Sequence, residues 1–202
     1  MRPLAHVARP VALLLVCALA AQLWWRAPVA PTSAPALAAP PGMALLRAAS
    51  LGEPVALARA LMLYVQGADG SASLRTLDYP ALAAWLERIV MLDPRGQAPL
   101  LAASQVYAAL PDPPRTRVML ELVHRQFVLD PDRRWPHLAH AALVARHRLH
   151  DLPLARRYAH ALRTRTTAGV LPAWAAQMEA SMHADADADA RRFAPATPRS
   201  MR

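Results

Sequence analysis

Four histidines lie close together in the chain, at positions 137, 140, 147 and 150. On a helix, His137 and His140 would share a face, as would His140 and His147, and such a pair binds a metal when a third ligand converges on it. The stretch contains no carboxylate, and Asp151 is the nearest candidate. We therefore expect these histidines to line a polar groove or to hydrogen-bond between helices, and we expect no cofactor. A His-metal enzyme remains an alternative.

Other catalytic patterns are missing from the sequence. Ser104 sits in an Ala-rich stretch without a nucleophile elbow, and no GxGxxG or phosphate-binding loop occurs. Glu87 and Glu121 read as acids on helix surfaces, where neighbouring arginines would pair with them. Cys17 is the single cysteine, so an intramolecular disulfide is excluded. These observations favour a protein that is not an enzyme.

The basic residues are all arginine, 23 in number, and the net charge is +9. Lys and Asn are absent, which indicates a GC-rich bacterial genome and discounts part of the basicity. Residues 115–165 still hold eleven Arg against four acids, a field that favours acidic partners, anionic lipid or nucleic acid. The alternative is a solvated Arg-rich surface. In the phrase RRWP, residues 133–136, we expect Trp135 to pack inward at the start of a helix pair.

An apolar run at residues 10–25 lies between Arg9 and Arg26, and the predicted membrane segment covers residues 10–26. Its length is slightly short for a membrane helix, but flanking arginines can extend toward the headgroups and two tryptophans sit where an interfacial belt would lie. We predict a transmembrane anchor with residues 1–9 in the cytoplasm, or alternatively a signal peptide that is cleaved after Ala20. The residues expected to contact the membrane are Val11, Leu14, Leu15, Leu19, Leu23, Trp24 and Trp25.

Two segments have compositions that do not build a core. Residues 27–42 are rich in Pro and Ala and predict an extended spacer, and residues 185–202 predict a disordered tail. The composition changes abruptly after His183. One hypothesis is that a shifted reading frame replaces the last native helix, which sequencing of the transcript would test.

The body, residues 43–184, shows helical periodicity without sustained alternation of β-branched residues. Asp-x-Pro occurs at residues 78–80, 112–114 and 151–153, where the Asp would cap a helix and the Pro would need no amide partner. The phrase Leu-Asp-Pro at 92–94 and 129–131 would end two helices. Pro99, Pro136 and Pro172 would open alternate helices. We predict helices at residues 54–67, 79–92, 97–110, 113–129, 135–150, 152–166 and 171–184.

This pattern resembles the tetratricopeptide repeat (TPR), in which two helices form a repeat and a Pro follows the second helix. The spacing of the two Leu-Asp-Pro phrases and of the opening prolines carries the resemblance over residues 52–184. The Trp-x2-Leu-Gly-x2-Tyr stretch of that family is missing, and small residues in the second helices are replaced by Leu82, Ile89, Met119 and Gln126. The chain is also similar to membrane-anchored TPR-like proteins of proteobacteria, which brings no activity with it.

The sequence thus predicts an all-α fold in which antiparallel helix hairpins stack as a short right-handed TPR-like solenoid behind an N-terminal membrane helix. We expect a single-pass protein of the bacterial inner membrane with its domain in the periplasm, or a secreted periplasmic form if the signal is cleaved. The expected partner is a protein or peptide of acidic character, contacted by Gln105, Tyr107, His140, His147, Arg156 and Arg163. Nucleic-acid or membrane-surface binding in the cytoplasm is the alternative.

Overall fold

The structure is a computed structural model in which Cys17 and residues 37–71 and 74–184 are described. It divides the chain into two compact units, residues 1–35 and 36–202. The predicted cytoplasmic segment, membrane segment and tail lie outside the described residues, apart from Cys17, which is exposed. The described part of the second unit is helical and contains no strand, which confirms the all-α class.

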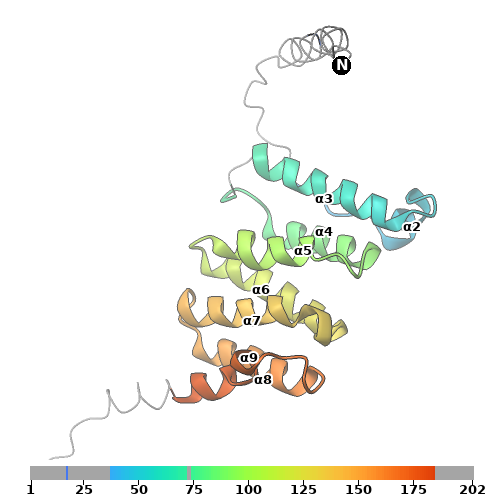
Figure 1. Ribbon diagram of the computed structural model, residues 1–202. Coiled ribbons are helices and arrows are strands. Elements are labelled where there is room, and N and C mark those ends of the chain that lie inside the picture. The colour runs from blue at the N-terminus through green and yellow to red at the C-terminus, as the bar shows by residue number, and fades with distance from the viewer. Residues whose placement is uncertain (1–16, 18–36, 72–73, 185–202) are drawn as a thin grey trace, which may run out of the picture. The chain divides into compact units, whose positions relative to one another are not determined.

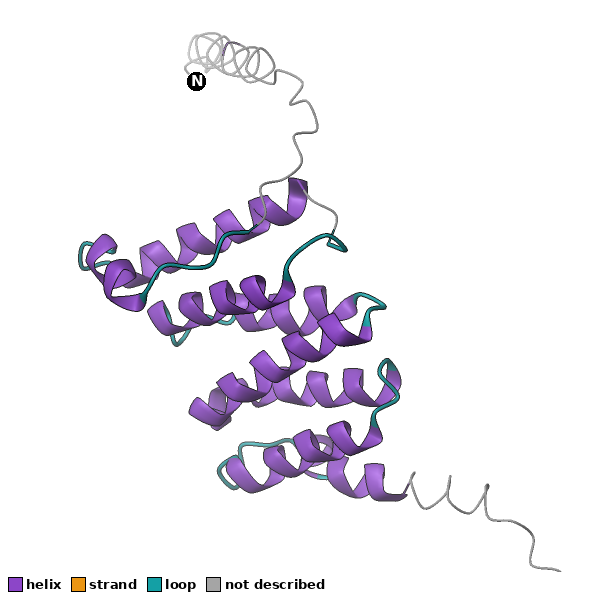
Figure 2. Ribbon diagram, turned by 180° about the vertical axis from the view of Figure 1, so that it is seen from behind, coloured by secondary structure: helices purple, strands orange, loops and turns teal. Residues whose placement is uncertain are grey.

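The helices form a stack in which each element packs on its neighbours in sequence (Figure 1, Figure 2). Contacts join α3 with α4, α4 with α6, α6 with α7 and α7 with α8. The elements are α2 (Met43–Ala49), α3 (Pro54–Ser71), α4 (Tyr79–Leu92), α5 (Ala98–Leu101), η1 (Ala102–Val106), η2 (Tyr107–Ala109), α6 (Pro113–Leu129), α7 (Pro131–His147), α8 (Leu152–Arg165) and α9 (Ala173–Ala176).

Three helices begin as the Asp-x-Pro signal predicts. The Asp78 carboxylate accepts a hydrogen bond from the amide of Ala81 at 3.2 Å. Asp112 accepts from Arg115 at 3.3 Å, and Asp151 accepts from Leu154 at 3.0 Å. Each Asp occupies the N-cap of its helix, and Pro is the second helical residue in all three. The capping chemistry is local, which is why the sequence alone could identify it.

The Leu-Asp-Pro phrases end α4 at Leu92 and α6 at Leu129, as predicted. After the first phrase, Asp93 Oδ1 accepts from the amides of Arg95 at 3.2 Å and Gly96 at 3.0 Å, so this Asp serves a turn. A Cβ atom at Gly96 would lie 2.7 Å from Asp93 Oδ2, so a larger residue there would force the Asp93 carboxylate to move. The turn between α4 and α5 therefore depends on both residues.

The second phrase does more than end a helix, and the predicted start of α7 is wrong. Asp130 is the N-cap of α7 and Pro131 is its first residue, so α6 and α7 meet at a sharp corner. Pro136, expected to open this helix, lies inside it. It is tolerated because Asp132, whose carbonyl loses an amide partner, is exposed in the first turn and can accept from water.

Three other elements differ from the prediction. A short helix, α2, precedes α3 and was not predicted. The predicted helix at 97–110 changes from α to π geometry at η1 and to 3-10 geometry at η2. The last predicted helix is interrupted at Gln177, after which residues 178–184 are helical.

The core is continuous through the stack. It consists of aliphatic side chains, methionines, tyrosines and many alanines, whose small size lets α7 and α8 approach closely. Large side chains with less than 2% exposure include Tyr79, Leu86, Met119, Phe127, Leu138, Tyr158 and Leu162. The core also includes Leu37 from the end of the predicted spacer, and the indole nitrogen of Trp85 donates to the carbonyl of Ala38 at 2.6 Å.

Candidate interaction surface

The histidines of α7 do not assemble a metal site. His137 is buried, and its Nε2 lies 2.6 Å from Oε1 of Gln97, the N-cap residue of α5. His140 is half-buried, His147 is exposed, and His150 lies beyond the helix with a φ of 52°. No group of three or more His, Cys, Asp or Glu side chains that could hold a metal occurs in the described part of the chain. The predicted hydrogen bonding between elements is confirmed for His137.

Burial gives two of these histidines a neutral character at physiological pH. Burial, then the nearby charges of Arg134 and His140, lowers the pKa of His137. Burial, then the charge of Arg148, lowers the pKa of His140. Both rings can therefore act as polar groups without a formal charge.

Acidic side chains on the even-numbered helices form a repeating set of contacts. Glu87 on α4 accepts from Gln126 at 3.3 Å and lies 3.8 Å from the guanidinium of Arg125, both on α6. Glu121 on α6 in turn accepts from Arg157 at 2.6 Å and from the hydroxyl of Tyr158 at 3.5 Å, both on α8. The same arrangement thus occurs twice, one helix pair apart. We call these two sets of contacts the Glu–Arg ladder.

A third acid, outside the ladder as defined, pairs with α8 at the C-terminal end of the stack. Glu179 accepts from Arg163 at 2.5 Å and contacts His160 at 2.9 Å. The hydrogen bond from Arg163, then the bond from His160, lowers the pKa of the Glu179 carboxyl. Arg163, which was expected to attract a partner, is therefore already paired with an acid of this chain.

Arginines also bind backbone carbonyls one repeat away. Arg134 is buried and donates to the Gln126 carbonyl at 2.7 Å, to the Gln126 side chain at 3.0 Å and to the Pro94 carbonyl at 3.2 Å. Arg148 donates to the carbonyl of Ala109, and Arg115 donates to that of Arg75. The bonds to Pro94, Ala109 and Arg75 join residues 39 or 40 positions apart, so they link successive helix pairs.

The prediction for RRWP is confirmed in part. Trp135 is half-buried and packs against the hydrophobic core, with its ring centroid 5.9 Å from that of Trp174. The neighbouring Arg134 is buried more deeply, which was not predicted. The guanidinium satisfies carbonyls that lie on other elements, and such long-range bonds leave no local signal in the sequence. Much of the positive field expected from residues 115–165 is accordingly neutralised or used inside the stack.

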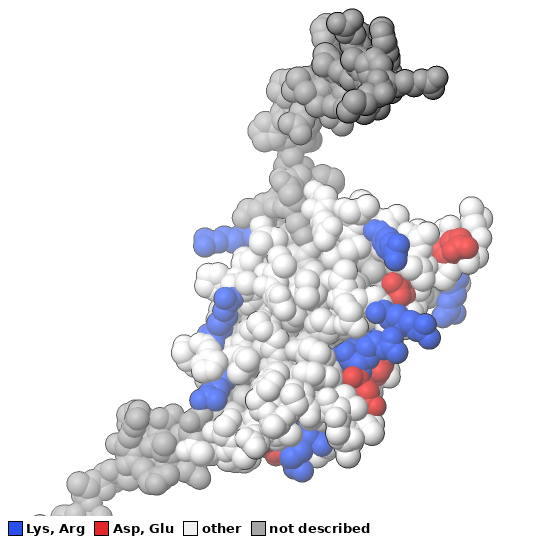
Figure 3. Space-filling view, viewed as in Figure 1, with Lys and Arg blue, Asp and Glu red and all other residues white. Residues whose placement is uncertain are grey.

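The odd-numbered helices present a different surface. Exposed side chains on it are Leu101 on α5, Gln105 and Val106 on η1, and Leu143 and His147 on α7, with His140 half-buried between them. In Figure 1, α5 and α7 lie nearer the viewer than α4 and α6, and Figure 3 shows from the same side a broad uncharged area with arginines toward its edges. We call these six residues the odd-helix face.

Two of the other predicted contact residues are placed differently. Tyr107 is only 1% exposed, because its ring packs edge-on against Tyr79 inside the stack, so its expected role in partner contact is corrected to a role in the core. Arg156 is half-buried, and its Nε has no hydrogen-bond partner among the described residues. Gln105 and His147 are exposed and His140 is half-buried, so their role in partner contact stays a prediction.

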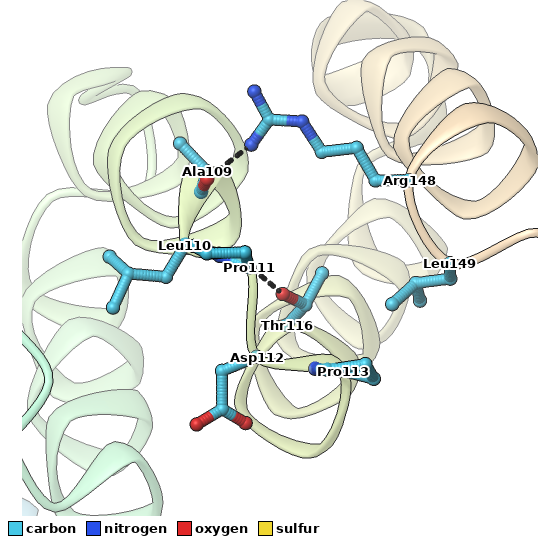
Figure 4. Close-up of a pocket in the computed structure, with 8 residues that line it drawn as sticks. All are labelled: Ala109, Leu110, Pro111, Asp112, Pro113, Thr116, Arg148 and Leu149. Atoms are coloured by element: carbon cyan, nitrogen blue, oxygen red, sulfur yellow. Dashed lines mark hydrogen bonds between the residues drawn. The ribbon is translucent and has the colours of Figure 1, made fainter.

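Two cavities lie at turns between the helices. One of about 200 Å³ is formed by the α3, α4 and α5 elements and is lined by Ala58, Arg59, Met62, Ile89, Asp93, Gly96, Gln97, Ala98 and Pro99. A larger one of about 460 Å³ lies where the η2–α6 and α7–α8 turns meet (Figure 4). There Thr116 donates to the carbonyl of Leu110 at 3.1 Å and Arg148 reaches Ala109, while Leu149, Pro111 and Pro113 supply apolar walls.

No single helix among the described residues is long and apolar enough to cross a membrane. The bent pair of α2 and residues 54–67, which turns by 110°, passes the same test of length and composition only as a pair. The seven residues predicted to contact the membrane, Val11 to Trp25, lie outside the described part of the chain, so the anchor stays a prediction.

Comparison of the chain with protein-family models, with curated proteins and with solved structures finds no match.

Proposed function

We propose that the chain is a membrane-anchored, TPR-like scaffold of the bacterial periplasm that binds a protein segment on its odd-helix face and catalyses no reaction. The stacked helices and the recurrence of equivalent contacts at about the predicted repeat distance support the TPR-like description. The predicted anchor at residues 10–26 supports the location.

The observation that carries the proposal is the contrast in charge between surfaces. The half-buried acids of the ladder have arginine partners, whereas the odd-helix face consists of leucine, valine, glutamine and histidine and contains no arginine and no acid. Apolar side chains surrounded by polar groups are typical of sites that bind other proteins. Polar groups of Gln105 and His140 would orient the segment, and Leu101, Val106 and Leu143 would contact its apolar side chains.

The acidic character expected for the partner loses part of its basis. Arg163 is paired with Glu179, and Arg156 is half-buried. We propose that the affinity comes mainly from apolar contact, and that any acidic residues of the partner meet arginines at the edges of the face. Binding would then depend only weakly on salt.

Site-specific photo-crosslinking in intact cells tests this role. A photoreactive residue at Leu143, 38% exposed on α7, should capture a discrete protein partner. The control is a photoreactive residue at Val128, 36% exposed on α6. It should capture no protein, or proteins other than the partner captured from Leu143. Leu143→Glu should abolish the crosslink formed from Gln105 while Val128→Glu preserves it. Equal capture from both positions would reject the odd-helix face as the binding surface.

A further inference from the structure

The first two helices of the stack expose large apolar side chains. Leu45 on α2, Leu51 in the turn, and Val55, Leu63 and Tyr64 on α3 are all exposed, with Leu51 at 92% and Leu63 at 69%. We call the outer surface of these two helices, to which the five residues belong, the α2–α3 face. The core side of α3 is formed instead by Ala58, Met62 and Val65, which are buried. Helix α3 lies at one end of the stack, so nothing in the described chain covers this face (Figure 1).

Leu51 is held in an unfavourable backbone conformation. Its φ of 50° lies in the left-handed region, and Gly52 follows with a φ of 90°. A branched residue in this region costs roughly 1–2 kcal/mol relative to the right-handed form, a cost that glycine or asparagine largely avoids. Leu51 bears this cost although its side chain is exposed and gains no packing in return. We take this as a sign of a contact made outside the chain.

The chain enters the domain beside the same face. Leu37 is buried, and the carbonyl of Ala38 accepts from Trp85, whose ring centroid lies 5.3 Å from that of Tyr64 on α3. Only residues 27–36 separate this point from the predicted membrane segment. Ten residues span at most roughly 33–36 Å when fully extended. An anchored chain would therefore keep its α2–α3 end close to the bilayer.

We propose that the α2–α3 face rests on the lipid surface, with Leu51 and Leu63 inserted among the headgroups; this rests on the proposed anchor. Leucine and tyrosine suit the interfacial region. The exposed charges on residues 43–67 are Arg47, Arg59 and Glu53, a net of +1, so apolar contact dominates over attraction to anionic lipid. Resting this end of the stack on the membrane would hold the odd-helix face in a fixed orientation to it.

Spin labelling of the full chain in liposomes tests the contact. In a Cys17→Ser background, Leu51→Cys, Leu63→Cys and Leu129→Cys each receive a nitroxide, and Leu129 is a matched control because it is 71% exposed on α6. Oxygen, which partitions into lipid, should relax the labels at positions 51 and 63 more than a water-soluble nickel complex does. The order should be reversed at position 129, in phosphatidylcholine with or without phosphatidylglycerol.

Three outcomes would overturn the proposal. If the labels at 51 and 63 are as accessible to nickel as the label at 129, the α2–α3 face is in water and does not contact lipid. In that case, sedimentation of the chain with the liposomes would still support the anchor. Dipolar broadening between labels at 63 in two copies, unchanged by lipid, would assign the face to a dimer. A chain that leaves the liposomes would reject both the contact and the anchor.

Leu51→Asn separates strain from contact. Because asparagine tolerates the left-handed region, the variant should keep or raise the Tm of the full chain. In liposomes it should also make a label at position 63 more accessible to nickel. Leu129→Asn should leave that label unchanged. A raised Tm without any change at position 63 would show that the leucine contributes nothing to the membrane contact.

Discussion

The two long surfaces of the stack are built from opposite chemistry. On the even-numbered helices, Glu87 and Glu121 each receive partners from the next even helix, so charge is used within the chain. On the odd-numbered helices, Leu101, Gln105 and Leu143 are exposed without such partners. The difference indicates that the charged surface helps to set the spacing of the repeats, and that the uncharged surface is the one left for another molecule.

The largest loss of stability is expected on substitution of Arg134, which is buried and bonds to carbonyls of Gln126 and Pro94. Arg134→Met removes charge-assisted hydrogen bonds to two carbonyls and one amide oxygen in a buried site. The free energy of unfolding should fall by about 3 kcal/mol. Urea unfolding of the detergent-solubilised full chain, followed by circular dichroism, measures the loss.

The neighbouring Arg133 provides the control for this substitution. It is exposed and pairs with Asp130 at 3.1 Å, so Arg133→Met should cost about 0.5 kcal/mol or less. Equal losses for the two variants would mean that the buried contacts of Arg134 do not hold the helix pairs together.

A second effect concerns the helix starts on the charged side. Asp151 caps α8 and also accepts from Arg117 on α6 at 2.5 Å. Asp151→Ala should lower the free energy of unfolding by about 1–2 kcal/mol. Asp130→Ala should cost less, because the Asp130 side chain makes no capping hydrogen bond to α7. The Tm values of the two variants compare them directly, and a larger loss for Asp130 would contradict the capping argument.

These helix starts show what could be read from the sequence. The caps at Asp78, Asp112 and Asp151 and the ends at Leu92 and Leu129 depend on residues within three positions, so their chemistry is visible locally. The start of α7 was missed because one dipeptide, Asp130-Pro131, ends one helix and begins the next. A dipeptide that can both end and begin a helix does not show, from the sequence alone, where the next helix starts.

The candidate surface was only partly predictable for a related reason. Tyr107 lies at helical spacing from the buried Leu100 and Ala103, so periodicity alone could have assigned it to the core. The burial of Arg134 had no such signal, because its partners lie on α6 and at Pro94, 40 residues earlier. Charge counts therefore overstated the free positive field, since they cannot show which arginines are already used.

The odd-helix side should respond to pH through His137. Burial, then the charge of Arg134 and the ring of His140, lowers the pKa of His137 in the folded chain below its ordinary value of 6.5. The unfolded chain then binds a proton first as the pH falls. The stability contributed by neutral His137 is complete above pH 6.5 and is lost as the pH falls through the folded pKa. His137→Gln should reduce the loss of stability between neutral and acidic pH.

Urea unfolding at a series of pH values measures this dependence in the parent and the variant. His140 also has a pKa lowered by burial, so part of the pH dependence should persist in His137→Gln. An unchanged slope in the variant would show that folding does not lower the pKa of His137.

The smallest effect should come from the ladder itself. Glu121 and Arg157 are 2.6 Å apart with side chains about half exposed, so a double-mutant cycle with Glu121→Gln and Arg157→Gln should give a coupling of about 0.5 kcal/mol that shrinks with added salt. The Glu87–Arg125 pair, at 3.8 Å, should give less. Zero coupling at both pairs, together with loss of the crosslinked partner in Arg157→Gln, would show that the ladder side binds the partner and does not stabilise the stack. A measurable coupling with partner capture intact would keep the ladder as a structural spacer and leave the odd-helix face as the binding surface.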